Sequence, residues 1–120
     1  MNGLNGLEAV SIDCTGDPTA IATWWQGLIG GDVVEQPEGY AELYAPGFPC
    51  LQFLPTPDAK SVKNRLHLDL RSDDFDAAIE AALAHGATRA DDVYAGGSWQ
   101  VLRDPEGNEF CILRPHPHAT

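Results

Sequence analysis

The residue types best suited to chemistry in this sequence recur at alternate positions of strand-like segments. His67 and Asp69 stand two positions apart, so both would lie on the polar face of a strand whose other face is leucine-rich. A neutral imidazole can accept or donate a proton near pH 7. We therefore assign His67 ligand contact and the candidate catalytic role, with a structural hydrogen bond to a neighbour such as Asp69 or Arg65 as the alternative.

Five more residues complete the predicted ligand-binding set. Asp69 could orient or charge the imidazole, and Gln52 could hydrogen-bond a neutral ligand. Trp99 and Tyr44 could form an aromatic wall for a planar ligand, although packing at a subunit interface is an equal alternative. Cys111 is also a candidate for ligand contact. No neighbouring cation argues for a lowered thiol pKa there, so core packing is the favoured interpretation.

The elements that must position these residues begin with a strand at 7–14, where apolar and polar residues alternate. Asp17 and Pro18 then open a helix that ends at Gly30, because aspartate caps free backbone N–H groups and glycine takes a left-handed conformation cheaply. Three short strands are predicted to follow, at 32–35, 40–44 and 49–54.

The same order then recurs. A strand is predicted at 64–72, with Leu66, Leu68 and Leu70 on its apolar face. Asp73 or Asp74 caps a second helix, which Gly86 ends. Three strands follow, at 88–94, 98–103 and 109–114.

This internal repeat, with an offset of about 58 residues, is the most informative feature of the chain. It predicts an α+β fold of two tandem βαβββ modules, about 6–57 and 63–115, in a single domain over 1–120. Residues 116–120 form a tail to which we assign no role. Each module would leave one face of its curved mixed sheet without a helix. The bare faces should therefore enclose a cleft, within one chain or between two.

Composition excludes several classes of partner. The 120 residues carry 18 acidic and 7 basic side chains, a net charge of −11, which argues against nucleic acid and against an anionic membrane surface. Three cysteines without a close pair suit a reducing compartment. The first residues lack the pattern of a signal peptide, and no apolar run is long enough to span a bilayer. We therefore expect a cytoplasmic protein.

Three stretches carry a family resemblance: Asp17-Pro18 ahead of a tryptophan-bearing helix, the segment at 63–70, and the segment at 99–110 with its Asp-Pro-Glu-Gly-Asn turn. In these stretches the chain resembles the glyoxalase/bleomycin-resistance/dioxygenase (vicinal-oxygen-chelate) superfamily, in particular its short glyoxalase-like domain proteins. The resemblance covers roughly residues 6–115. It implies the two-module fold and a homodimer.

The resemblance also implies where a divalent metal would bind, at one position on the first and one on the fourth strand of each module. These positions fall on Ala9, on Cys50 or Gln52, on His67 and on Cys111. The set holds no carboxylate where the family pattern has two, so Mg²⁺ or Mn²⁺ would find few ligands. We therefore expect no metal or other cofactor, with zinc on His67 and the two thiols as the alternative.

The expected function is sequestration of a small organic molecule in the cleft, as in the drug-binding members of this superfamily. The alternative is a lyase, isomerase or cyclase in which His67 transfers a proton. The missing carboxylates argue against a metal-dependent glyoxalase or dioxygenase. No other catalytic motif, such as GxSxG or HExxH, occurs in the sequence.

Overall fold

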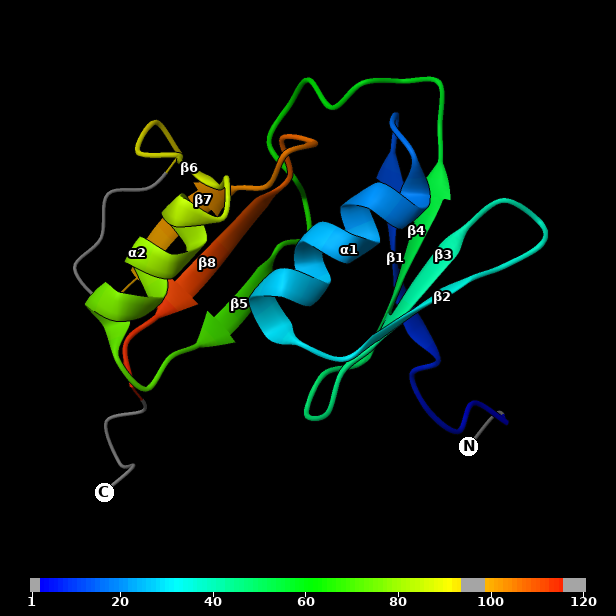
Figure 1. Ribbon diagram of the computed structural model, residues 1–120, viewed down its shortest axis with the longest axis horizontal. Coiled ribbons are helices and arrows are strands. Elements are labelled where there is room, and N and C mark those ends of the chain that lie inside the picture. Colours follow the sequence, from blue (N-terminus) through cyan, green and yellow to red (C-terminus); the bar gives the residue numbers. More distant parts are fainter. Residues whose placement is uncertain (1–2, 94–98, 116–120) are drawn as a thin grey trace. The chain divides into compact units, whose positions relative to one another are not determined.

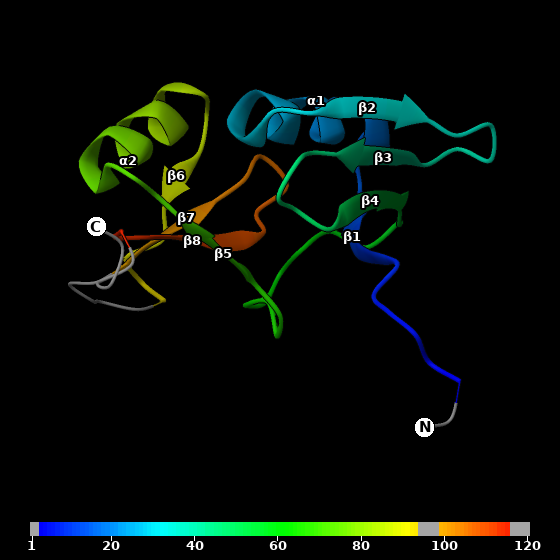
Figure 2. The same cartoon turned by 90° about the horizontal axis from the view of Figure 1, so that it is seen from below.

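The computed structural model describes residues 3–93 and 99–115, and the chain divides into two compact units, Met1–Ala59 and Lys60–Thr120. Each unit is one βαβββ module whose four strands form a mixed sheet, so the predicted fold class is confirmed. In each unit a single helix lies along one face of the sheet (Figures 1 and 2).

The first unit contains all five elements that the sequence predicts for it. They are β1 (Ala9–Cys14), α1 (Pro18–Ile29), β2 (Asp32–Glu35), β3 (Ala41–Tyr44) and β4 (Cys50–Pro55). The strand order is β1-β4-β3-β2, with β1 parallel to β4 and the other pairs antiparallel. The predicted bounds hold to within two residues because glycine and proline turns separate these strands in the sequence.

Capping residues set the two ends of helix α1, and a buried tryptophan packs it against the sheet. The Asp17 carboxylate accepts from the backbone N–H of Thr19 at 3.2 Å, and Gly30 closes the helix at φ 81°. Trp25 is buried, while Trp24 is half-buried with its ring edge-to-face against Trp25 at 5.4 Å. Trp25 therefore anchors the helix in the core of the first unit. The core on this side of the sheet is completed by Ile21, Ala22, Leu43, Leu51 and Phe53.

The second unit repeats the plan with shorter strands. Its elements are β5 (Leu68–Arg71), α2 (Phe75–Ala84), β6 (Thr88–Arg89), β7 (Trp99–Arg103) and β8 (Glu109–Leu113). The strand order is β5-β8-β7-β6, again with the first pair parallel.

The alternation of strand β8 sorts its side chains between two environments. The Arg114 guanidinium, just after the strand, lies 4.2 Å from the centre of the Phe75 ring on α2, so residues of the same parity, Phe110 and Ile112, face the helix. On the opposite face Cys111 is buried in a small apolar cluster. That cluster also contains Val101, Ala90, Val93 and Leu113.

Two predicted strands were wrong in extent. The predicted strand 64–72 begins only at Leu68, and Leu66, expected in the core, is 87% exposed. The predicted strand 88–94 ends at Arg89, because the chain turns there and Ala90 and Val93 pack onto the face without a helix. Tyr94 and Ser98, at the ends of two predicted strands, lie outside the described residues.

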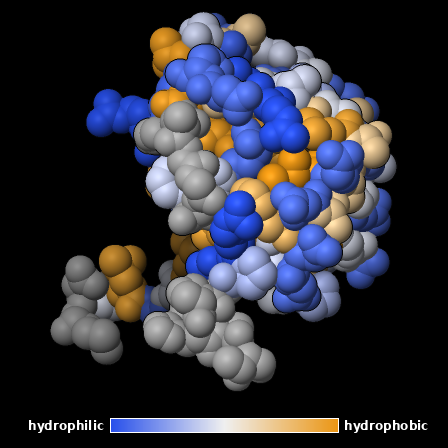
Figure 3. All heavy atoms as spheres, turned by 90° about the vertical axis from the view of Figure 1, so that its left-hand side faces the viewer, coloured by the Kyte–Doolittle hydropathy of each residue, from blue (hydrophilic) through white to orange (hydrophobic). Residues whose placement is uncertain are grey.

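The surface drawn in Figure 3 is largely hydrophilic, with apolar areas between polar side chains. Scattered apolar exposure of this kind is ordinary for a folded domain. No helix within residues 3–93 and 99–115 has the length and apolar character that crossing a membrane requires.

Candidate functional site

Three predicted site residues meet on the helix-free face of the second sheet. Asp69 on β5 lies beside Cys111 on β8, because the two are register partners in the parallel pair. His67 precedes β5 and points to the same face, with its Nε2 3.2 Å from Oδ1 of Asp69. The donor atoms of the three side chains all lie within 4.8 Å of one another. The sheet register thus joins residues that are more than forty positions apart in the sequence.

These three residues line a cavity of about 270 Å³. Trp99, at the start of β7, and Leu113, at the end of β8, form its remaining wall. The lining is therefore largely apolar, with one polar pair, His67 and Asp69, at one side. Small-molecule sites commonly combine apolar walls with a few convergent polar groups.

The Cys111 thiol is held in its neutral form. Burial, together with the negative charge of Asp69 and its hydrogen bond to the thiol, raises the pKa of Cys111 to about 11. The thiolate is the nucleophilic form of cysteine, so Cys111 is a poor nucleophile at neutral pH. This agrees with the interpretation that Cys111 packs rather than reacts.

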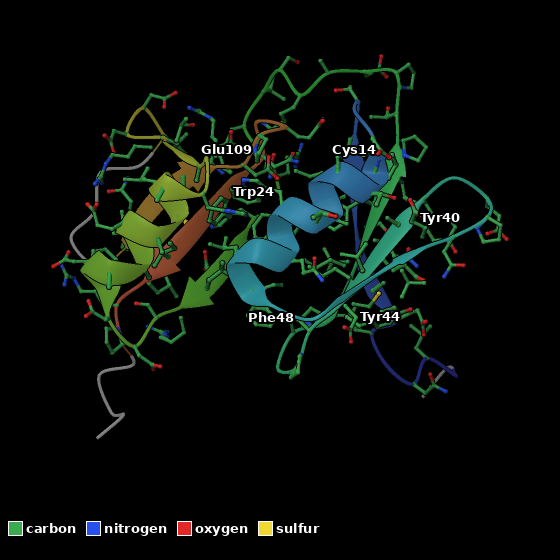
Figure 4. All side chains as sticks on the ribbon, viewed as in Figure 1. Cys14, Trp24, Tyr40, Tyr44, Phe48 and Glu109 are labelled. Atoms are coloured by element: carbon green, nitrogen blue, oxygen red, sulfur yellow. The ribbon has the colours of Figure 1, made fainter. Side chains whose placement is uncertain are left out.

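A buried carboxylate anchors the segment that leads to His67. Glu109, at the start of β8 (Figure 4), accepts from Lys60 Nζ at 3.1 Å and from Arg103 Nε at 3.0 Å on one oxygen. Its other oxygen accepts from the backbone N–H of Asn64 at 2.7 Å. We call this group of four residues the Glu109 clamp.

The Glu109 clamp explains why β5 starts late. It fixes Asn64 beside β8 through a side chain, and the strand pairing of this segment begins only at Leu68. Burial alone would raise the pKa of Glu109, but the Asn64 N–H and the two cations outweigh it and lower that pKa. His67, three residues after Asn64, is thereby anchored close to the clamp.

The other two predicted ligand-binding residues belong to a cluster in the first unit. Gln52 on β4 is the register partner of Glu42 on β3, and its Nε2 donates to Glu42 at 3.0 Å. Gln52 Oε1 also accepts from Ser11 on β1 at 3.0 Å. Tyr44, two residues after Glu42, shares its side of the sheet and is partly exposed (Figure 4). Burial and a hydrogen bond to Glu42 raise the pKa of Tyr44 to about 12.

The predicted residues therefore fall into two groups, one in each unit. Sequence reasoning missed Glu42 and Glu109, which are both buried carboxylates. Hydrogen bonds from Gln52 and Gln36 outweigh burial and lower the pKa of Glu42, so it stays ionised. One sequence signal could have identified both carboxylates: each is a charged residue within a short strand whose neighbouring residues are mostly apolar.

The first unit has a larger but more polar cavity, of about 460 Å³. It is lined partly by Asp17 and Glu35, and Thr19 Oγ1 donates to Glu35 at 2.8 Å. None of the predicted site residues lines it. The smaller cavity of the second unit is therefore the better candidate site.

The second-unit residues suit some metal ions better than others. The resemblance-based positions held no carboxylate, but the structure adds Asp69 to His67 and Cys111. Zinc accepts nitrogen, oxygen and sulfur ligands together, whereas Mg²⁺ and Mn²⁺ prefer several oxygens. The donor set thus fits a borderline cation and does not fit a hard one.

Comparison with known families and structures gives a consistent fold assignment. The family model described as a glyoxalase-like domain matches residues 9–113. No curated protein matches the chain at a significant level. A glyoxalase/bleomycin resistance protein/dioxygenase family enzyme from Burkholderia phytofirmans PsJN is 23% identical, with 91% of this chain and 98% of that chain covered and a TM-score of 0.72.

Two further structures are more distant in sequence. TnmS3, an antibiotic binding protein from Streptomyces sp. CB03234, is 18% identical, with 97% and 100% of the two chains covered and a TM-score of 0.65. A mutant of the fosfomycin resistance protein FosX from Listeria monocytogenes, complexed with Mn(II) and a dihydroxypropylphosphonic acid, is 11% identical, with 95% and 93% covered and a TM-score of 0.74. At these identities the likeness shows the fold alone.

Proposed function

Because the chain belongs to the glyoxalase-like domain family, we propose that it binds a small organic molecule in the cavity of its second unit. The observation that carries the proposal is the composition of the cavity wall. Trp99 and Leu113 offer apolar contact, and the His67–Asp69 pair offers hydrogen bonds at one side. Sequestration of this kind requires no metal, since aromatic contact supplies affinity and the polar pair supplies orientation.

The size of the cavity limits what it can hold. Ligand pockets typically measure about 300 to 1,000 Å³, and this one, at about 270 Å³, lies just below that range. It suits a compact planar molecule or one ring of a larger compound. TnmS3, an antibiotic binding protein of similar fold, favours a role in sequestration or resistance.

Equilibrium binding to a panel of planar phenols and quinones tests the proposal. Trp99 is 37% exposed, so a ligand in the cavity should change its fluorescence. Trp99→Phe should lose this signal, while Trp24→Phe, in the first unit, should keep it. Binding that survives Trp99→Ala and Leu113→Ala unchanged would contradict the proposed site.

A second function, proton transfer in a lyase, isomerase or cyclase reaction, is supported by one observation. Asp69 lies 3.2 Å from the His67 imidazole, and a carboxylate placed this way can orient a general base. His67→Ala separates the two functions. A binding protein should keep most of its affinity in this variant and release its ligand unchanged, whereas an enzyme should still bind but lose turnover by orders of magnitude.

Two expectations from the sequence stay predictions. Homodimerisation can be measured by light scattering during gel filtration, and a cytoplasmic location can be measured by cell fractionation. The second-unit cavity is lined by residues of a single unit of one chain. Ligand binding there should therefore show the same affinity at dilutions that favour the monomer.

A further inference from the structure

One wall residue of the second-unit cavity, His67, lies just outside the sheet that carries the others. Strand β5 begins at Leu68, and its pairing with β8 begins there too. We propose that Glu109, which is not among the described residues that line the cavity, is a positioning residue that sets the cavity's ligand specificity by holding His67 in place. This inference rests on the proposed function, and it adds a determinant of which planar ligands are preferred.

Glu109 holds the segment before His67 at two points. One carboxylate oxygen accepts from the backbone N–H of Asn64 at 2.7 Å, and the other accepts from Lys60 Nζ at 3.1 Å. The Asn64 side chain adds a third bond, from its Nδ2 to the backbone oxygen of Glu109 at 3.3 Å. Because His67 follows Asn64 by only three positions, these bonds fix where the chain enters the cavity wall.

The carboxylate of Glu109 is itself held firmly on the sheet. Its side chain is 2% exposed, so water competes little for its hydrogen bonds. Arg103, the register partner of Glu109 on strand β7, donates from Nε to the same oxygen as Lys60 at 3.0 Å. Glu109 is therefore fixed to the sheet on one side and holds residues 60–64 on the other.

The placement of His67 matters for specificity because this residue and Asp69 form the polar side of the cavity. Trp99 and Leu113 give apolar contact that any planar ligand can use. The imidazole, 3.2 Å from Asp69 Oδ1, adds a hydrogen bond only for ligands that carry a polar group at this edge. Since a hydrogen bond weakens steeply with distance and angle, a displaced His67 should weaken binding of hydroxylated ligands and spare unsubstituted ones.

A role of Glu109 in stability alone makes a different prediction. A smaller folded fraction would lower the apparent affinity for every ligand by the same factor. A change in the position of His67 would lower the affinity for hydroxylated ligands alone. The ratio of the affinities for a hydroxylated and an unsubstituted ligand therefore separates the two roles.

Calorimetric titration with 2-naphthol and naphthalene, two planar probes that differ by one hydroxyl group, tests the proposal. We expect the wild type to bind 2-naphthol about 3- to 10-fold more tightly, which is the contribution of one hydrogen bond. In Glu109→Gln the affinity for naphthalene should stay within about twofold of the wild type, and the preference for 2-naphthol should fall below about twofold. All proteins are titrated at a temperature at which circular dichroism shows them to be folded.

Matched variants separate position from stability. Asn64→Pro removes the backbone N–H that donates to Glu109, whereas Asn64→Ala keeps it. The proline variant should lose the preference for 2-naphthol as Glu109→Gln does, and the alanine variant should keep it. Ile79→Ala, a core change on helix α2, should lower stability and leave the preference unchanged.

The position of His67 can also be followed without a ligand, by NMR of its ring. The ring signals should move in Glu109→Gln and in Asn64→Pro, because the contact with Asp69 changes. They should stay in place in Asn64→Ala and in Ile79→Ala, which leave the carboxylate of Glu109 bound to the backbone of residue 64.

Three results would overturn the proposal. The first is a preference for 2-naphthol that survives in both Glu109→Gln and Asn64→Pro, and the second is a set of His67 ring signals that neither variant moves. The third is equal binding of the two probes by the wild type, which would leave the proposed function standing. Absence of binding by both probes would instead count against the proposed function, and the ring signals would then decide whether Glu109 positions His67.

Discussion

Replacing Glu109 with glutamine should strongly destabilise the second unit. The Glu109 side chain is 2% exposed and receives hydrogen bonds from Lys60, Arg103 and Asn64. Glutamine keeps the shape but has one acceptor oxygen, and its NH₂ group would face cationic donors. Arg103 would keep its second partner, Asp92, at 3.0 Å.

The expected loss of unfolding free energy depends on how far Lys60 and Arg103, the cationic partners of Glu109, are exposed to water. Hydrogen bonds to charged groups contribute about 1.5 to 3 kcal/mol each, and breaking a buried ion pair costs roughly 3 to 5 kcal/mol. Lys60 and Arg103 are 20% and 30% exposed, so water can partly replace the carboxylate. We therefore expect Glu109→Gln to lower the free energy of unfolding by about 2 to 4 kcal/mol at pH 7.

Urea denaturation of the wild type and Glu109→Gln at several pH values measures this loss. The pKa of Glu109 is lowered in the folded protein, so its contribution is complete above the ordinary carboxyl range. The gap between the two proteins should therefore shrink as the pH falls below roughly 4.3, toward the folded pKa.

Asp92→Asn is the matched control for the clamp. It removes another carboxylate partner of the same Arg103, but one whose side chain is 70% exposed. The control should denature close to the wild type. Equal losses in the two variants, or a gap that does not change with pH, would refute the reasoning.

Three further predictions test the cavity and the core. Trp99→Ala should weaken binding of a planar aromatic ligand by roughly 10- to 100-fold in calorimetric titration; unchanged affinity would place the ligand elsewhere. Cys111, buried and with its pKa raised to about 11, should be alkylated at neutral pH far more slowly in native than in urea-unfolded protein, as followed by mass spectrometry; equal rates would contradict its burial. Trp25→Ala should cost about 3 to 5 kcal/mol of unfolding free energy, whereas Leu66→Ala should cost almost none because that side chain is exposed; similar losses would show that Leu66 belongs to the core.

Local patterns were sufficient to predict most of the fold. Alternation in strand β1 and the Asp17 cap of α1 act over a few residues, so the sequence reveals them directly. Leu66 was placed wrongly for the opposite reason. It continues the alternation of Leu68 and Leu70, but the strand begins only at Leu68. Before it, the backbone N–H of Asn64 donates to the side chain of Glu109, more than forty positions away, instead of joining a strand ladder. Such a tertiary contact leaves no periodic signal.

The sequence predicted which residues belong to the candidate site better than it predicted which of them lie together. Position on a strand predicted that His67 and Asp69 would share a face, and the structure places them together. The register of β5 against β8, which adds Cys111, depends on pairing between distant strands. Glu42 was missed because its partners, such as Gln52, come from neighbouring strands that only the folded sheet brings together.

Heteronuclear NMR of the protein bound to a ligand from the phenol and quinone panel tests the central claim most directly. We predict that the largest shift changes fall on the Trp99 indole N–H, the His67 ring and the Leu113 methyl groups, which line one cavity. Saturable binding whose shift changes are confined to the Gln52 and Tyr44 cluster of the first unit would contradict the account.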